Sequence, residues 1–438
     1  MRSNLRNVIQ LSSGVVILFS SFSCHGFITV AVLKTLVQIN PDIYKDCAYI
    51  ALCFYYSSFM ISCLCSAFIV SKIGSKVGLI FGSLCFTIYM LQFILFYEYI
   101  FYLLNILLGF AAAILWTSQG EKLASYSDVE TSERNTTIFM AITQNGILFG
   151  GIFMLIIAFG VDNIDHLSLI DIRIYYIIFS AICFVGVLTF IFLPNAIIIN
   201  DFEKRMPLNS LNDKEMEEET KNCKKSSLIK IATKKEMITL IPIYLFLGVS
   251  LSFFSVVIPS LLPSSESLKK HIEWFGPICY ILFGFGQICG SFTFSFLTKH
   301  SGILSKKGKV LLAMFGYSFS FSVFILYIPH NSLRGYGFLT PLMSVLALAN
   351  FIYGFSDIMF KTQVTSELLE ILPKNGGEAF ALFNFWIAAG AASSFLSSMY
   401  INFLIQCSIL FGMLVIAFMS YVTLQKIKTS SRSMDNDS

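Results

Sequence analysis

Twelve apolar runs, each close to the length that a helix needs to cross a bilayer, dominate this sequence. A transmembrane helix takes about 20 apolar residues. Such runs occupy 8–33, 48–70, 78–97, 100–119, 136–160 and 174–194, and, after a polar interval, 237–262, 274–298, 310–328, 338–360, 379–403 and 405–424. Backbone groups inside hydrocarbon must be paired within their own segment, which predicts that every run is a helix. We therefore predict an all-α, polytopic membrane protein with twelve transmembrane helices, joined by turns as short as Tyr97-Glu98-Tyr99.

The composition excludes a soluble protein of this length, because it is 56% hydrophobic and only 13% charged. Soluble domains carry about 25% charged residues, and their cores could not hide this much apolar surface. Most of the eleven cysteines lie within the apolar runs, which is typical of small buried side chains and not of a disulfide framework or a metal site. No His-Glu-x-x-His, Gly-x-Ser-x-Gly or phosphate-loop motif occurs. We expect no enzymatic activity, no cofactor, no metal and no nucleic-acid partner.

The distribution of Lys and Arg predicts how the chain crosses the bilayer. With both termini in the cytosol, 24 of the 30 cations lie in cytosolic segments and 6 lie outside. Without the central loop the count is still 15 against 6. Cytosolic loops carry the excess of Lys and Arg, so we expect an integral, multi-pass protein with both termini cytosolic. The sequon at Asn135 would then carry no glycan, and both the plasma membrane and an endomembrane remain open.

A polar interval divides the chain into two halves. We expect an N-terminal six-helix half at 1–194, a cytosolic linker at 195–235, a C-terminal six-helix half at 236–425 and a cytosolic tail at 426–438. The linker places an acidic patch before a basic run, which favours a solvated linker with a short surface helix; an amphipathic segment on the anionic inner leaflet is the alternative. The fourth and tenth runs both contain Gly-Phe followed by Thr and Gln, which close the fourth run and stand just after position 360 in the tenth. This weak repeat is expected of parallel duplication, as in the major facilitator fold.

Several motifs resemble the UNC-ninety-three-like branch of the major facilitator superfamily. They are Gly109–Gly120 (GFAAAILWTSQG) followed by Glu133-Arg134-Asn135, Gly354-Phe355-Ser356-Asp357 with Thr362-Gln363, Gly284-x-Gly286-Gln287-x-x-Gly290, and Ala379–Phe383. The resemblance runs nearly end to end and implies the major facilitator fold. Most members are orphans, while the founding nematode member resembles a regulatory subunit of a potassium-channel complex, and others resemble trafficking escorts of receptors.

The sequence departs from this family at charged positions. The loop 71–78 keeps the glycines and cations of the facilitator gating motif but lacks its acidic residue. Gln287 and Asn384 stand where relatives often carry Glu and Lys. Two groups that could couple an ion or a proton are therefore neutral, which weighs against proton-driven transport.

Asp357 is the strongest candidate functional residue, because an ionisable side chain within a span costs a few kcal/mol or more. By the run boundaries it lies about one turn from the inner end of its span, so a local pair with Lys361 is the alternative. We expect instead that Asp357 faces the interior and pairs with a polar group on a neighbouring helix. The other substrate-binding or gating candidates are polar or aromatic: Gln144, Asn145, Gln287, Trp116, Gln119, Asn384, Arg134 and Glu378.

Charged residues also begin two spans at the inner side. Arg134 stands beside Glu133 at the fifth span, and Glu378 begins the eleventh. Carboxylates at helix N-termini act as caps; the functional alternative is that these charges bridge the halves when the inner mouth closes. His25, near the outer end of the first span, is more typical of a satisfied histidine than of a proton relay.

Two functions fit these features. The first is an orphan facilitator-type protein in the lipid bilayer that moves an unidentified small solute by alternating access. The alternative is a non-transporting regulatory or escort subunit of an ion channel or membrane receptor.

Overall fold

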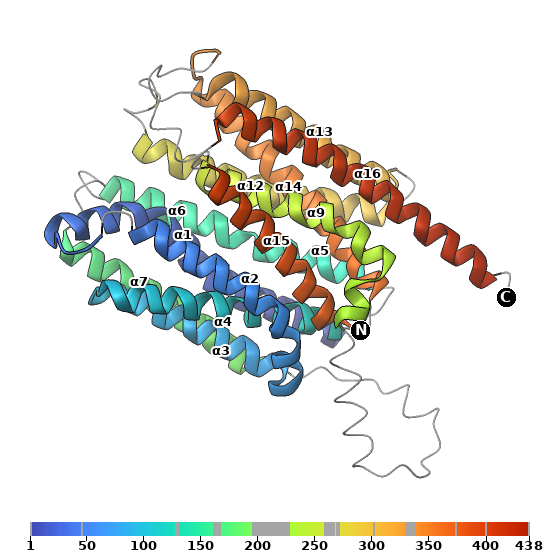
Figure 1. The fold of residues 1–438 in the computed structure, drawn as a ribbon, viewed down its shortest axis with the longest axis horizontal. Helices are drawn as coiled ribbons and strands as arrows, with labels where there is room; N and C mark the ends of the chain where they lie inside the picture. Colours follow the sequence, from blue (N-terminus) through green and yellow to red (C-terminus); the bar gives the residue numbers. More distant parts are fainter. Residues whose placement is uncertain are drawn as a thin grey trace, which may run out of the picture.

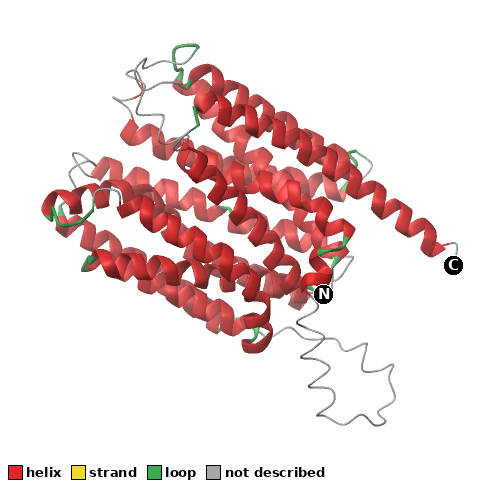
Figure 2. Cartoon of the chain, viewed as in Figure 1, coloured by secondary structure: helices red, strands yellow, loops and turns green. Residues whose placement is uncertain are grey.

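The protein is an all-helical bundle (Figures 1 and 2). The structure, a computed structural model, describes residues 2–44, 47–127, 131–160, 168–194, 228–257, 268, 272–300, 303–328, 338–372, 375–398 and 401–436. Both termini lie at one end of the bundle, which we call the terminal end; the opposite end is the distal end (Figure 1). Most of the predicted linker, 195–227, lies outside the described residues.

The N-terminal half contains six helical passes. They are α1 (Arg2–Ile39), α2 (Cys47–Ile73), α3 (Ser75–Leu91) with the short η1 (Gln92–Ile94), α4 (Glu98–Ser125), α5 (Ser132–Thr143) followed by α6 (Asn145–Gly160), and α7 (Leu169–Ile191). The turn between α2 and α3 depends on Gly74, whose φ of 84° lies in the left-handed region that favours glycine.

The C-terminal half also contains six passes. They are α9 (Lys235–Ser252) with η3 (Phe253–Val257), α12 (Ile272–Lys299), α13 (Lys306–Tyr327), α14 (Met343–Ile371), α15 (Gly376–Ser398) and α16 (Phe403–Asn436). The predicted tail continues α16 as far as Asn436.

Within the described part of the chain, eleven spans are long and apolar enough to cross a membrane. The remaining pass is α15, a helix of 23 residues. Its small and polar residues are tolerated because it packs among α9, α2 and α4 and is mostly buried by protein. By contrast, large apolar side chains such as Ile61, Phe159 and Phe315 are more than half exposed, as expected where lipid is the solvent. With α15, the described residues form twelve passes, the number that the sequence predicts.

The two halves repeat the same packing. In the first half α2 and α3 both contact α4, and α1 contacts α6 and α7; in the second, α12 and α13 both contact α14, and α9 contacts α15 and α16. Each pair in one half thus has its counterpart six passes later. The halves meet through α2 and α4 against α15, and through α5 and α6 against α12, with α5 also touching α14.

Glycines set the closest helix crossings, and they explain the weak sequence repeat. A Cβ on Gly109 of α4 would lie 2.4 Å from the Tyr55 carbonyl oxygen of α2. A Cβ on Gly354 of α14 would lie 2.0 Å from the Phe283 carbonyl oxygen of α12, and one on Gly286 would lie 2.0 Å from the Phe351 carbonyl oxygen. Small residues allow backbones this close in a membrane, where packing holds helices together. The repeated Gly-Phe steps therefore mark equivalent crossings in the two halves.

Several predicted boundaries differ from the structure, among them those of the tenth and fifth runs and of the turn after the third. The tenth run, predicted as 338–360, continues as α14 to Ile371. The fifth is interrupted between α5 and α6 at Gln144. The turn between the third and fourth passes is Leu95–Tyr97, and Glu98 already belongs to α4, where it accepts hydrogen bonds from the Tyr44 amide and the Tyr102 hydroxyl. These helix ends depend on side-chain and backbone partners, which the lengths of the apolar runs do not reveal.

Candidate functional site

Asp357 lies near the middle of α14, not one turn from its end, because that helix extends to Ile371. Its carboxylate accepts a hydrogen bond from Gln287 Nε2 of α12 at 3.0 Å and another from the Tyr317 hydroxyl of α13 at 3.0 Å. The predicted pairing with neighbouring helices is therefore confirmed. No ion pair joins Asp357 to Lys361 in the described part of the chain, so the acid is held by two neutral donors.

A second polar chain lies one turn away on α14. The Tyr353 hydroxyl lies 2.6 Å from Ser250 Oγ of α9 and donates to the Ser250 carbonyl oxygen at 2.9 Å. Tyr353 and Tyr317 pack edge to face with ring centroids 5.3 Å apart. Helices α9, α12, α13 and α14 are thus tied together by polar groups around the Asp357 level.

At the terminal end the halves are in close contact along α4 and α15, in what we call the terminal seam. A Cβ on Gly120 would lie 2.2 Å from the Phe380 ring, and one on Gly376 would lie 2.6 Å from the Ala124 Cβ. Gly120 and Ala124 are four residues apart on α4, and Gly376 and Phe380 are four residues apart on α15. Each pair therefore lies on one face of its helix. If this antiparallel register continues for one more turn toward the distal end, Trp116 of α4 comes to the height of Asn384 of α15.

A separate contact joins the halves at the terminal end, where α5 meets α12 and α13 through a buried ion pair. Lys309 Nζ of α13 donates to Glu133 Oε1 of α5 at 2.7 Å and to Thr298 Oγ1 of α12 at 2.6 Å. The Thr298 hydroxyl also donates to Glu133 Oε1 at 2.8 Å. The Lys309 side chain is only 4% exposed, against 23% for Glu133, and it lies 4.4 Å from the Phe294 ring centroid. The contact thus links α5 of one half to α12 and α13 of the other.

The bridging charges are not the ones that the sequence singled out. Arg134 is exposed and donates to its neighbour Asn135, at 3.2 and 3.4 Å. Glu378 lies in the first turn of α15 and forms no ion pair with a described residue in this conformation. The bridge is made instead by Glu133, which sequence analysis treated only as the neighbour of Arg134. The Lys-Lys-Gly-Lys run at 306–309, which mirrors the Gly and Lys pattern of 71–78, was the signal available for its partner.

A larger charge cluster within the C-terminal half was missed because it lies beyond the predicted end of the tenth span. Glu367 of α14 is fully buried and Glu370 is 16% exposed at its side chain. Their partners come from α13, α14 and α16: Lys306, Lys428, Tyr421, Gln425 and Gln363. The cluster fastens α13 and α16 to the terminal end of α14.

The remaining candidate residues lie either at the break between α5 and α6 or along the terminal seam. Gln144 is buried at the break between α5 and α6, and the Asn145 amide donates to the Ala141 and Ile142 carbonyl oxygens at 2.8 and 3.0 Å. Those contacts fit a structural role in the break. Trp116, Gln119 and Asn384 lie along the terminal seam, where Trp116 is half-buried and packs on Phe19 with centroids 4.7 Å apart.

His25 is satisfied within the N-terminal half, as expected. Its Nδ1 lies 2.8 Å from the Tyr176 hydroxyl, and the Thr29 hydroxyl is 3.2 Å away. Rings of Phe22, Tyr89 and Phe93 surround the imidazole. This environment favours a packed histidine over a proton relay.

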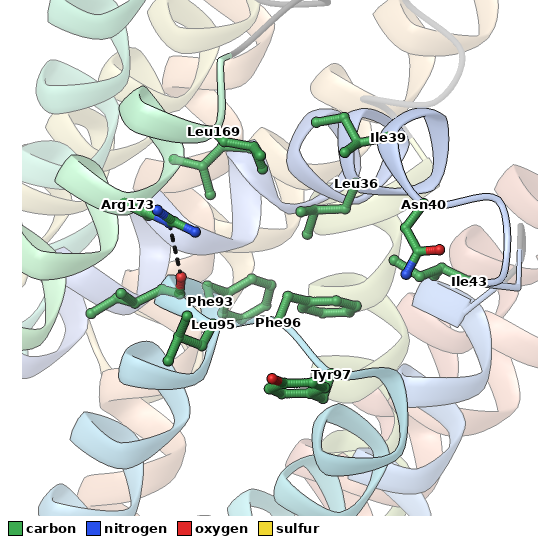
Figure 3. Close-up of a pocket in the computed structure, with 12 residues that line it drawn as sticks. Leu36, Ile39, Asn40, Ile43, Phe93, Leu95, Phe96, Tyr97, Leu169 and Arg173 are labelled. Carbon is green, nitrogen blue, oxygen red and sulfur yellow. Dashed lines mark hydrogen bonds between the residues drawn. The ribbon is translucent and has the colours of Figure 1, made fainter.

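A small cavity of about 230 Å³ lies at the distal end, between the ends of α1, η1 and α7 (Figure 3). Most of the residues that line it are apolar, and Arg173 closes one side by donating from Nε to the Ile94 carbonyl oxygen at 3.2 Å. None of the predicted candidates lines it, so this cavity is separate from the Asp357 level and from the terminal seam.

Comparisons with known proteins place this arrangement in context. The sequence model described as "Ion channel regulatory protein UNC-93" matches residues 40–422. The chain is 28% identical over 412 residues to UNC93-like protein MFSD11 of Xenopus tropicalis, covering 91% of this chain and 90% of that protein. It is 27% identical over 410 residues to UNC93-like protein MFSD11 of Xenopus laevis, with the same coverage.

Two solved structures of the transporter FucP have the same fold. The chain resembles a point variant of the E. coli fucose:proton symporter FucP with a TM-score of 0.67 and 11% identity, covering 96% of this chain and 99% of that one. It resembles FucP in the outward conformation with a TM-score of 0.64 and 13% identity, covering 95% and 99%. At this identity the likeness shows the fold alone, and it confirms the major facilitator architecture.

Proposed function

The chain belongs to the UNC-93 family, as the family model matches most of its length, and from this premise we propose that it moves a small solute by alternating access. In this mechanism two rigid halves rock about a site between them, exposing it to each side of the membrane in turn. The terminal end is cytosolic in our proposal, on the basis of the 24 cations against 6.

The observation that carries the proposal is the buried Lys309–Glu133 pair between the halves. Removing two charges from water is costly, and a buried pair is often no more stabilising than well-packed apolar groups. A permanently closed interface gains little from such a pair. An interface that opens can use it, because both charges are hydrated when the halves separate. The pair therefore fits a gate that makes and breaks during a transport cycle.

The contacts within each half support the same mechanism. Glycine crossings hold α4 against α2 and α14 against α12, and the Glu367 cluster fastens α13 and α16 to α14. Each half is thus strongly tied within itself. The halves also meet closely, since a Cβ on Gly284 of α12 would lie 2.9 Å from the Leu148 nitrogen of α6, so the support for movement between them rests on the Glu133–Lys309 pair.

The test is to measure distances across both ends of the purified protein in lipid nanodiscs by double electron–electron resonance. In a background without reactive cysteines, one spin-label pair at Ser71 and Ile303 reports on the terminal end, and a second at Ile39 and Leu342 reports on the distal end; all four positions are exposed. Alternating access predicts two distances for each pair, with populations that change in opposite directions. A single narrow distance for both pairs would contradict it.

A regulatory subunit is the second candidate, favoured by the description of the matching family as ion channel regulatory proteins. It predicts a stable membrane partner that copurifies in mild detergent and a single distance for each label pair. Copurification together with two distances would favour the carrier, because a non-transporting subunit needs no alternation.

A further inference from the structure

Three buried polar groups around the terminal seam have no hydrogen-bond partner among the described residues. They are Gln119 Oε1 on α4, Asn384 Nδ2 on α15 and the Tyr244 hydroxyl on α9. Their side chains are deeply buried, with residue exposures of 7%, 8% and 0%. Buried polar groups in folded proteins are nearly always paired. Other buried atoms in the described bundle also lack a partner, among them Ser118 Oγ, Gln287 Oε1 and Thr362 Oγ1. What distinguishes Gln119, Asn384 and Tyr244 is that α4 and α9 both pack against α15, so their three helices meet at one seam.

The helix contacts bring the three groups to the same region. The register set by Gly120 against Phe380 and by Ala124 against Gly376 puts Gln119 beside the seam and Asn384 one turn farther toward the distal end. Helix α9 is locked to α15, because a Cβ on Gly248 would lie 2.1 Å from the Ile387 carbonyl oxygen. Tyr244 then packs edge to face on Phe383, the neighbour of Asn384, with centroids 5.0 Å apart.

The chemistry of this region is neutral. An amide offers both donors and an acceptor, and a phenol offers one donor and an acceptor. On α4 the nearest ionisable residues, Glu121 and Lys122, follow Gln119 toward the terminal end, where Glu121 lies close to Gly377. Trp116 is half-buried level with Asn384 and presents an aromatic surface. A buried ionic solute would need an opposite charge at this level, and the described parts of α4, α9 and α15 provide none there.

We propose that Gln119, Asn384 and Tyr244 bind the solute of this carrier, and that the solute is an uncharged molecule rich in hydroxyl or amide groups. This inference rests on the carrier function proposed above and names its substrate class. The unpaired groups are the ones that the bound solute satisfies. A charged solute would instead have to bind at another level.

The first test needs no solute. Tyr244→Phe removes only the unpaired hydroxyl, so the variant should melt about 1–3 °C higher than the unmodified protein in detergent. Tyr353→Phe is the matched control, because that hydroxyl is equally buried but bonded to Ser250; it should melt lower. A Tyr244→Phe variant that melts lower, as the control does, would show that its hydroxyl is paired in the folded bundle and would overturn the proposal.

The second test identifies the solute class by ligand-induced melting shifts. The neutral probes are myo-inositol, D-glucose, N-acetylglucosamine and uridine, and the charged probes are citrate, benzoate, choline and spermidine. We expect at least one neutral probe to raise the melting temperature in a concentration-dependent way, and Asn384→Leu or Gln119→Met to weaken its apparent affinity by about tenfold. No shift with any neutral probe, or shifts with charged probes alone, would overturn the assignment.

The two proposals fail separately. Charged probes that bind a protein with two interconverting distances would leave the carrier function standing and remove only the substrate class. Neutral probes that bind a protein with single distances would keep the site and remove transport.

Discussion

Neutralising Glu133 should open the terminal end of the bundle. In Glu133→Gln the Lys309 ammonium, whose side chain is 4% exposed, loses its carboxylate partner and keeps the Thr298 hydroxyl and the Phe294 ring. Removing one member of a buried ion pair costs about 3–5 kcal/mol. Because Glu133 is 23% exposed and Gln retains a hydrogen-bond acceptor, we expect a smaller cost to the closed state, about 2–3 kcal/mol. Because each 1.4 kcal/mol is about a factor of ten, the open population should rise by about 30- to 150-fold.

The Ser71–Ile303 label pair measures this shift directly. A minor long-distance component in the unmodified protein should become the main component in Glu133→Gln. Adding Lys309→Met to the same protein should reverse much of the change, because removing both charges leaves no buried ion without a partner. Lys307→Gln, at an exposed cation on the same helix, is the control and should leave the distances unchanged. An unaltered distribution in Glu133→Gln would refute the gate.

Other variants test the rest of the bundle. Asp357→Asn should reach the membrane in normal amounts and cost only about 1–2 kcal/mol, because its two neutral donors can reorient, yet it should lose solute movement; full activity would remove Asp357 from the site. Glu367→Gln should lower stability by about 3–5 kcal/mol, since two lysines lose a buried partner, and an unchanged melting temperature would contradict the role of this cluster. Gly286→Ala should cost at least about 1–3 kcal/mol through overlap with a carbonyl oxygen, whereas Gly412→Ala, with open space around it, should be neutral or stabilising. A sequon engineered within 161–172 should be glycosylated if that loop faces away from the cytosol, and an unmodified site there with glycan on a cytosolic-side sequon would reverse the orientation.

The spans could be predicted from sequence because lipid imposes a length and an apolar composition on each helix, whatever the neighbours are. The end of the tenth span could not be predicted from sequence. Glu367 reads as a loop residue until Lys306 and Lys428 neutralise it, and these partners lie 61 residues away on either side. An even greater separation in sequence, 176 residues, hides the pairing of Lys309 with Glu133.

The candidate residues divide along the same line. Asp357 could be identified because an acid within an apolar run stands out by itself. Tyr244 could not be identified from sequence as a candidate. Its distinguishing feature is a hydroxyl without a partner, and only the packed helices show which hydroxyls are left unpaired. Arg134 illustrates the opposite error, since a charge at a span boundary looks the same in sequence whether it bridges two helices or only reaches its neighbour.

The glycine crossing of α12 and α14 also affects how genetic variants of this protein should be interpreted. Gly354 and Asp357 are three positions apart on one helix, yet changes at the two should act through different steps in the life of the protein. A larger residue at Gly354 prevents two backbones from meeting, so the chain would be removed by quality control and little protein would reach its membrane. A neutral residue at Asp357 leaves that crossing intact, so the protein would be abundant and inactive. Measuring abundance beside activity would therefore separate neighbouring missense changes that a loss-of-function score alone treats as equal.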